Sequence, residues 1–178
     1  MYKMGDKEAK VLEVVFSRPE YKFHIRELAR MTKFHPNTII KITDRLAKDK
    51  IVQKRKHKNL VEVYCDYESE IYKRKKQLFN ISQIHDSGLL DNLIEFYDHP
   101  QAIILFGSYS RGEDWSTGDI DIAIVSSKKE KLDLVKFEKK LKRSIHLLAF
   151  DYKEISKEFY NNLINGFVLY GFVKSEKL

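Results

Sequence analysis

Residues 106–125, FGSYSRGEDWSTGDIDIAIV, contain a Gly-Ser pair followed, after ten intervening residues, by two aspartates that are separated by one residue. Alternation along a strand places Asp119 and Asp121 on one face and the neighbouring isoleucines on the other. Two adjacent carboxylates at the end of a buried strand repel each other, and their desolvation is costly unless a cation lies between them. The spacing therefore predicts a divalent-metal site, and its oxygen ligands favour Mg²⁺ or Mn²⁺.

The Gly-Ser pair supplies the second half of this chemistry. Gly107 follows a short apolar run, residues 102–106, which is typical of a buried strand that ends in a tight turn. A glycine lets backbone N–H groups approach a phosphate closely, and the hydroxyl of Ser108 adds a donor. Arg111 lies close enough in sequence to assist. A Gly-Ser turn or an Asp-x-Asp alone has an ordinary structural explanation, but together they predict phosphate binding beside a metal site.

In this order and spacing, the four signature residues resemble the minimal nucleotidyltransferases of the DNA polymerase β superfamily, without insertion. The resemblance extends from about Leu89 to a closing helix and strand at residues 161–171. It implies a small mixed sheet backed by helices, and transfer of a nucleoside monophosphate from an NTP, with ATP as the expected donor, to a hydroxyl. It makes Gly107 and Ser108 ligands of the triphosphate, and Asp119 and Asp121 ligands of the metal; Arg111 remains a further nucleotide-binding candidate because it lies close in sequence.

The family's third carboxylate is missing from its expected place. Active members carry it on the next core strand, as a metal ligand and as the base for the acceptor hydroxyl. Residues 143–150, RSIHLLAF, are the candidate strand, and His146 aligns best with that position. A neutral imidazole can accept a proton or bind one metal ion, but it cannot bridge two ions. His146 is therefore either a third catalytic residue or a strand histidine beside the site, and Asp151 lies too far along to replace it.

Charge and length indicate two domains. The chain has 178 residues and a net charge of +7; residues 1–80 carry 20 Lys and Arg against 11 Asp and Glu, whereas residues 81–178 carry 13 against 15. A basic module is typical of nucleic-acid binding, and a lysine-rich solvated surface is the alternative. The predicted boundaries are a first domain at 1–68, a helical connector at 69–86 and a second domain at 87–178.

The sequence pattern of the N-terminal half predicts three helices and a basic hairpin. Apolar spacing indicates a core helix at 7–16 and a second helix at 24–34, whose inner side holds Ile25, Leu28, Ala29 and Met31. A third helix extends to about Lys48, with Asn37 or Thr38 as its cap. Two β-rich runs follow, at 51–56 and 60–65, and the three residues between them predict a hairpin.

This order resembles the winged helix-turn-helix of microbial transcription regulators. The resemblance covers residues 7–66 and implies a third helix in the major groove of double-stranded DNA, with the hairpin as a wing on the backbone. It assigns base reading to Asn37, Thr38, Lys41 and Arg45, and phosphate contacts to Lys54, Arg55, Lys56 and Lys58. The same fold also serves as a protein-binding module. Such regulators usually form homodimers, and the connector offers Ile71, Leu78 and Ile81 as a candidate seam.

The expected fold class is α+β: a winged-helix domain with a β-hairpin wing, followed by a small mixed-sheet nucleotidyltransferase domain. The first expected function is an enzyme that nucleotidylates a hydroxyl acceptor, such as a protein, as antitoxin members of this family do, coupled to DNA binding. The alternative is a DNA-binding transcription regulator whose second domain is a degraded nucleotide sensor or dimerisation platform.

The ends and apolar runs of the sequence bear on localisation. The first ten residues carry charges where a signal peptide needs an apolar core, and no apolar run approaches the roughly 20 residues of a membrane span. A cytoplasmic protein with no membrane partner is therefore expected.

Overall fold

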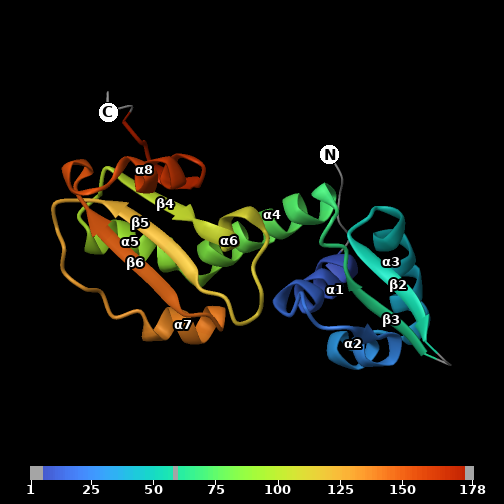
Figure 1. Cartoon of the computed structure of the whole chain (residues 1–178). Helices are drawn as coiled ribbons and strands as arrows, with labels where there is room; N and C mark the ends of the chain where they lie inside the picture. Colours follow the sequence, from blue (N-terminus) through green and yellow to red (C-terminus); the bar gives the residue numbers. More distant parts are fainter. Residues whose placement is uncertain (1–5, 58–59, 175–178) are drawn as a thin grey trace. The chain divides into compact units, whose positions relative to one another are not determined.

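The computed structural model describes residues 6–57 and 60–174. The chain divides into two compact units, Met1–Phe79 and Asn80–Leu178, and the division falls inside helix α4 (Glu70–Ser87), within the predicted connector. The predicted α+β class is confirmed: one unit joins helices to a three-stranded antiparallel sheet, and the other joins helices to a mixed four-stranded sheet (Figure 1).

Three helices and a small sheet surround one core in the N-terminal unit. The core is formed by apolar residues at helical spacing together with inward-facing strand residues, including Val15, Leu28, Ile39, Leu46 and Val63. The sheet order is β1-β3-β2. The elements are α1 (Asp6–Ser17), β1 (Phe23–His24), α2 (Ile25–Thr32), α3 (Pro36–Lys48), β2 (Val52–His57) and β3 (Leu60–Cys65).

The second helix is shorter than predicted at its start. Phe23 and His24 pair with Val63 and Glu62 as strand β1, so the prediction that the helix includes His24 is wrong. The cause is a sheet pairing with residues almost 40 positions away in the chain, which no local pattern reveals.

The buried face of α2 and the N-terminal cap of α3 both differ from the predictions. Met31 is exposed rather than buried, and Thr32 takes the inner position, where its hydroxyl donates to the carbonyl of Leu28 at 2.7 Å. Helix α3 begins at Pro36, not after an Asn37 or Thr38 cap, and its cap is His35. Proline fits the first helical position because the N–H that it lacks has no partner there in any helix.

The predicted hairpin is confirmed. Strands β2 and β3 pair antiparallel, with Val52 opposite Cys65 and His57 opposite Leu60. Four of the five β2 side chains after Val52 are exposed, Arg55 and Lys56 among them, and Lys54 is partly buried. Lys58, which was expected to contact phosphate from the wing, lies outside the described residues.

The sheet of the C-terminal unit has the order β6-β5-β4-β7. Strand β5 is parallel to β6 and antiparallel to β4, so the expected mixed sheet is confirmed. Because β4 and β5 run in opposite directions, the end of β4 meets the start of β5, and Phe106 pairs with Asp121. The strands are β4 (Ala102–Phe106), β5 (Ile120–Val125), β6 (Ile145–Phe150) and β7 (Phe167–Gly171).

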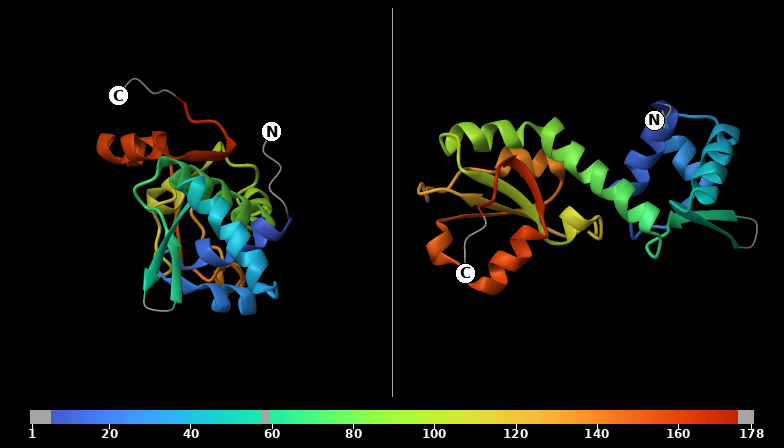
Figure 2. Two further views of the ribbon diagram at one scale, coloured as in Figure 1. Left: turned by 90° about the vertical axis from the view of Figure 1, so that its right-hand side faces the viewer. Right: turned by 90° about the horizontal axis from the view of Figure 1, so that it is seen from above.

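Helices cover both faces of this sheet. Helices α5 (Leu89–Phe96) and α7 (Val135–Leu141) and the end of α4 pack on one face, and α8 (Lys157–Ile164) packs on the other (Figure 2). Strand β5 is therefore buried on both sides along most of its length, and Asp121 is its one partly exposed residue. None of the helices in the described parts of the chain is long and apolar enough to cross a membrane.

Helix α4 contains the three apolar residues that were expected at a dimer seam. Ile71 and Leu78 are 45% and 63% exposed. Ile81 instead packs against the core of the C-terminal unit, together with Ile84. Only the first two side chains are therefore accessible in the single chain.

Candidate functional site

The Gly-Ser turn joins β4 to the short helix α6 (Gly107–Arg111). Gly107 has φ +73°, in the left-handed region that glycine occupies without strain. A Cβ atom at this position would lie 2.3 Å from Oδ2 of Asp121, closer than any non-bonded contact allows. The turn and the second aspartate are therefore in direct contact, and only glycine fits between them.

The two aspartates lie at the start of β5. Asp119 immediately precedes the strand and Asp121 is its second residue. Their side chains are 42% and 29% exposed, whereas the residues that follow in the strand are buried. The carboxylates thus stand at the open end of a strand whose remainder is enclosed, which leaves them accessible to a ligand.

The next strand brings His146 to the same place. The parallel register pairs Asp121 with His146. Nδ1 of His146 lies 3.5 Å from Oδ1 of Asp121, and Nε2 lies 3.7 Å from Oδ2 of Asp119. Asp151 lies beyond the end of β6, where its carboxylate accepts a hydrogen bond from the backbone N–H of Lys153 at 3.1 Å. The imidazole, and not Asp151, is the third group facing this site.

The donor set suits one divalent cation. Within residues 6–57 and 60–174, no group of three or more His, Cys, Asp or Glu side chains is arranged as a metal centre. Two partly exposed carboxylates nevertheless offer the hard oxygen ligands that Mg²⁺ and Mn²⁺ prefer, with room for water and phosphate oxygens. Asp119 and Asp121 could hold such an ion, and His146 lacks the negative charge that would help to hold a second one.

Ser108 and Arg111 lie on the turn that contacts Asp121. Ser108 is partly buried in the first turn of α6, and its carbonyl accepts from the N–H of Glu113 at 3.0 Å. Arg111 is exposed at the end of the same helix, with its Nε 2.9 Å from Oε2 of Glu113. A phosphate would therefore compete with Glu113 for the guanidinium.

A buried polar network that the sequence did not suggest supports the loop between α6 and β5. Asp114 and Arg143 form an ion pair at 3.3 Å, with side chains 0% and 8% exposed. Asn80 donates to Oδ1 of Asp114 at 2.6 Å and to the carbonyl of Tyr109 at 2.8 Å, and Arg143 also donates to the carbonyl of Ser116. The network joins α4, α6, this loop and the start of β6.

This network positions the catalytic candidates indirectly. The loop held by Asp114 leads into Asp119, and Arg143 lies two residues before the strand that carries His146. Burial raises the pKa of the Tyr109 hydroxyl above its ordinary value, and the charge of Asp114 raises it further. The Tyr109 hydroxyl therefore stays neutral across the physiological pH range.

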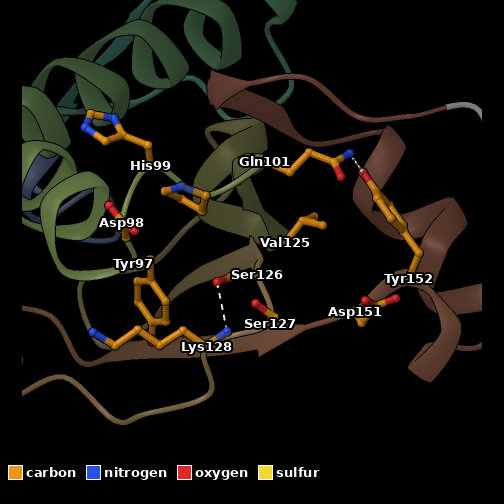
Figure 3. Close-up of a pocket in the computed structure, with 11 residues that line it drawn as sticks. Tyr97, Asp98, His99, Gln101, Val125, Ser126, Ser127, Lys128, Asp151 and Tyr152 are labelled. Carbon is orange, nitrogen blue, oxygen red and sulfur yellow. Dashed lines mark hydrogen bonds between the residues drawn. The ribbon is translucent and has the colours of Figure 1, made fainter.

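A pocket of about 490 Å³ lies at the opposite end of the same strands (Figure 3). Its polar groups are largely bonded to neighbouring protein groups: Gln101 donates to the Tyr152 hydroxyl at 3.3 Å, and Lys128 donates to the carbonyl of Phe96 at 2.7 Å. It contains none of the signature residues. The residues that the sequence predicts to bind nucleotide therefore lie at the other end of the sheet.

The residues expected to read DNA bases lie on α3. Asn37 and Lys41 are exposed, and Thr38 is partly buried. Arg45 is half-exposed, but its guanidinium forms an ion pair with Glu8, whose side chain is 2% exposed. Removing Arg45 would leave a buried carboxylate uncompensated, so this residue has a structural role irrespective of DNA.

The expected phosphate contacts lie on β2. Nζ of Lys54 is 2.5 Å from Oδ1 of Asp44, which joins the hairpin to α3. Arg55 and Lys56 are exposed farther along the strand. These two residues, together with Lys41, are therefore the best-placed basic side chains of the predicted set.

Comparison with known proteins bears on the C-terminal unit. Residues 89–172 match the family described as "Polymerase beta, Nucleotidyltransferase". The chain thus contains a polymerase β-like nucleotidyltransferase domain, which confirms that part of the resemblance predicted from the sequence. The match includes the Gly-Ser turn, both aspartates and His146, and it does not extend to residues 1–88. No curated protein matches the sequence.

Proposed function

We propose that residues 87–178 bind a nucleoside triphosphate, with ATP as the expected donor, together with Mg²⁺ or Mn²⁺, and transfer its nucleoside monophosphate to an acceptor hydroxyl. The observation that carries this proposal is the contact between Gly107 and Asp121, because it joins a phosphate-binding turn to a metal-binding carboxylate. The family match of residues 89–172 supports the same chemistry. The reaction requires only a free hydroxyl of its acceptor, whether that acceptor is a small molecule or a protein side chain.

Each residue has a defined task in the transfer. The backbone N–H groups after Gly107 and the hydroxyl of Ser108 bind the triphosphate. A cation on Asp119 and Asp121 would neutralise part of its charge. His146 accepts the proton of the acceptor hydroxyl, whose oxygen bonds to the α-phosphorus. The bond from the α-phosphorus to the bridging oxygen breaks, and pyrophosphate leaves with that electron pair.

One observation favours a second candidate function. His146 faces both aspartates at 3.5 and 3.7 Å, where active relatives would present a further carboxylate. A domain of this kind could bind nucleotide without transferring it and serve as a sensor or a dimerisation platform. The two candidates agree on nucleotide binding and differ only in transfer.

Substitution of His146 separates the two functions. We expect the wild-type chain, incubated with labelled ATP, Mg²⁺ and a cell extract, to label an acceptor. His146→Ala should lower the rate by about 10²–10⁴-fold, the usual contribution of a general base, with little change in ATP affinity. His146→Asp should restore a base with a negative charge and transfer at least as fast as the wild type.

The contrary outcomes are distinct. If the wild type binds Mg²⁺–ATP but labels nothing, and His146→Asp gains transfer, the sensor function is supported. If His146→Asp loses an activity that the wild type has, the imidazole itself is required. If neither substitution changes the rate or the metal affinity, His146 lies outside the working site.

We further propose that residues 1–68 bind double-stranded DNA as a winged helix-turn-helix and that the chain acts as a homodimer. The support is the order of three helices and a hairpin, with exposed basic side chains on α3 and β2, in a half of the chain with excess positive charge. Ile71 and Leu78 are the exposed apolar residues that we place at the interface of this homodimer.

Three basic residues test the DNA proposal. Replacing Lys41, Arg55 and Lys56 by alanine should weaken duplex binding. Each of the two β2 substitutions should lower the slope of log affinity against log salt concentration by about one, because one fewer counterion is released from the DNA. The measurement is duplex affinity of the full chain at several salt concentrations. Lys131→Ala with Lys157→Ala, on exposed positions of the other unit, controls for lost charge. Equal weakening by the control and by the β2 pair would contradict the proposal.

A further inference from the structure

One edge of the C-terminal sheet is apolar and exposed. β7 is the last strand in the sheet order and pairs with β4 alone among the strands that the structure describes. Seven large apolar side chains are exposed in the described part of this unit, and four of them lie within the nine residues 164–172. They are Ile164 at the end of α8, Phe167 and Val168 on β7, and Phe172 directly after it, with exposed fractions of 52%, 41%, 42% and 62%.

The segment that forms this edge carries no charge. Residues 159–173 contain no Asp, Glu, Lys, Arg or His, whereas charged residues make up 33% of the chain. Natural proteins usually protect an exposed edge strand with charged side chains, proline or a bulge, because it otherwise pairs with other strands. β7 has a bulge, where its register shifts between Ile103 and Ile104 of β4, but neither charge nor proline. A cluster of exposed apolar side chains on such an edge indicates a surface that a partner covers.

The opposite edge of the sheet is protected. Strand β6 bonds to β5 through alternate residues, and the N–H of Ile120 donates to the carbonyl of Ser144, so the N–H of Ile145 points away from β5. That N–H donates to Oε1 of Glu138 at 3.0 Å, which occupies a backbone donor of the edge. A charged residue, Asp151, follows the strand directly. Of the two edges, β7 is therefore the one suited to a protein partner.

A second copy of the chain is the partner that these features favour. A two-fold axis places a segment opposite itself, so a charged edge would meet like charges, which weaken association, whereas this edge meets none. The same lack of charge offers nothing to DNA phosphates or to an oppositely charged protein. Phe167 and Phe172 alone expose roughly 200 Å² at their exposed fractions. This is about a quarter of the roughly 800 Å² that each partner contributes to a standard interface.

We propose that the β7 edge of one chain packs against the β7 edge of a second copy across a two-fold axis. This assignment rests on the proposed homodimer, and it adds to the residues of α4 a contact within the C-terminal unit. In the order β6-β5-β4-β7, strand β4 separates β7 from β5. The contact therefore leaves the start of β5, and His146 on the far edge, open in both copies.

Analytical ultracentrifugation of the full chain tests the contact. We expect the wild type to dimerise with a dissociation constant in the micromolar range. Val168→Lys with Phe172→Lys should raise this constant by about 100-fold or more, because like charges then meet across the axis. The matched control, Val135→Lys with Leu148→Lys, adds the same charge at exposed apolar positions of the same unit away from β7 and should leave the constant unchanged.

A neutral variant guards against misfolding. Val168→Thr with Phe172→Ser adds no charge and should weaken the dimer by about tenfold or more through lost apolar contact. Circular dichroism should show the same secondary structure in all variants, because each changed side chain is exposed. Equal weakening by the β7 lysine pair and by its control would contradict the proposal.

Ile71→Lys with Leu78→Lys separates the β7 contact from the one on α4. A dimer that only this α4 pair disrupts would overturn the β7 contact and leave the proposed homodimer standing, whereas a monomeric wild type would overturn both. Hydrogen exchange gives an independent readout. The amides of residues 164–173 should exchange more slowly in the dimer than in the diluted chain, and slowing confined to α4 would again overturn the β7 contact.

Discussion

Replacing Asp119 and Asp121 together by asparagine is expected to abolish magnesium-dependent ATP binding while the domain stays folded. Both carboxylates stand at the open end of β5, where they would supply the negative charge that holds a cation. Asparagine keeps their size but removes their charge, so the affinity for Mg²⁺–ATP should fall by about 100-fold or more. Relief of the repulsion between them should leave stability unchanged or slightly higher. Calorimetric titration with ATP, with and without Mg²⁺, measures the effect.

A matched control removes the same charge elsewhere. Asp86 and Asp91 are exposed residues of the same unit and lie outside the site, so replacing both by asparagine should leave the affinity unchanged. If the Asp119 and Asp121 variant binds Mg²⁺–ATP as tightly as this control, the metal site has been placed wrongly. Transfer to any acceptor should be lost in parallel with binding.

Asp114→Ala is expected to lower the free energy of unfolding of the C-terminal unit by about 3–5 kcal/mol, because it leaves the buried guanidinium of Arg143 without its carboxylate. It also removes the acceptor for Asn80 at the start of the network. Urea unfolding followed by the fluorescence of Trp115, the single tryptophan, reports on this loop directly. An exposed ion pair nearby supplies the control: Glu113→Ala, which unpairs Arg111, should cost about 0–1 kcal/mol.

A second variant distinguishes charge from packing. Asp114→Leu combined with Arg143→Met replaces the ion pair by apolar side chains of similar length and should recover most of the lost stability. Equal stability of Asp114→Ala and Glu113→Ala would mean that the buried pair does not hold the loop. A double variant no more stable than Asp114→Ala would assign the loss to other contacts of Asp114.

The parts of the structure that could be predicted from the sequence are those in which the signal is local. Strand β5 follows from alternation within six residues, and the Gly-Ser turn and the aspartates lie within one 20-residue segment. The place of His146 beside Asp121 was expected only through the resemblance to the nucleotidyltransferase family, whose active members carry a third carboxylate on the next core strand. The mixed sheet was likewise implied by that resemblance and not by a local pattern.

The remainder depends on contacts between distant residues. Strand β1 is two residues long and exists only through its pairing with β3. Asp114 and Arg143 are separated by 29 positions, and Arg45 and Glu8 by 37, so neither pair leaves a periodic pattern. From sequence alone, an aspartate in a polar loop and an arginine on the outward face of a helix are both predicted to be exposed to solvent. Their buried partners become apparent only in the structure. These buried charges are where the sequence was least informative.

The contact between Gly107 and Asp121 also limits how such a domain can change during evolution. A methyl group at Gly107 would need the space that a carboxylate oxygen occupies, so a mutation there disturbs the Gly-Ser turn and Asp121 in one step. Changes at His146 meet no such obstacle, because that side chain is 67% exposed on an edge strand. If the proposed roles hold, a lineage can therefore exchange its proton acceptor while the nucleotide site persists, so that transfer is lost or regained without passing through a protein that no longer binds nucleotide.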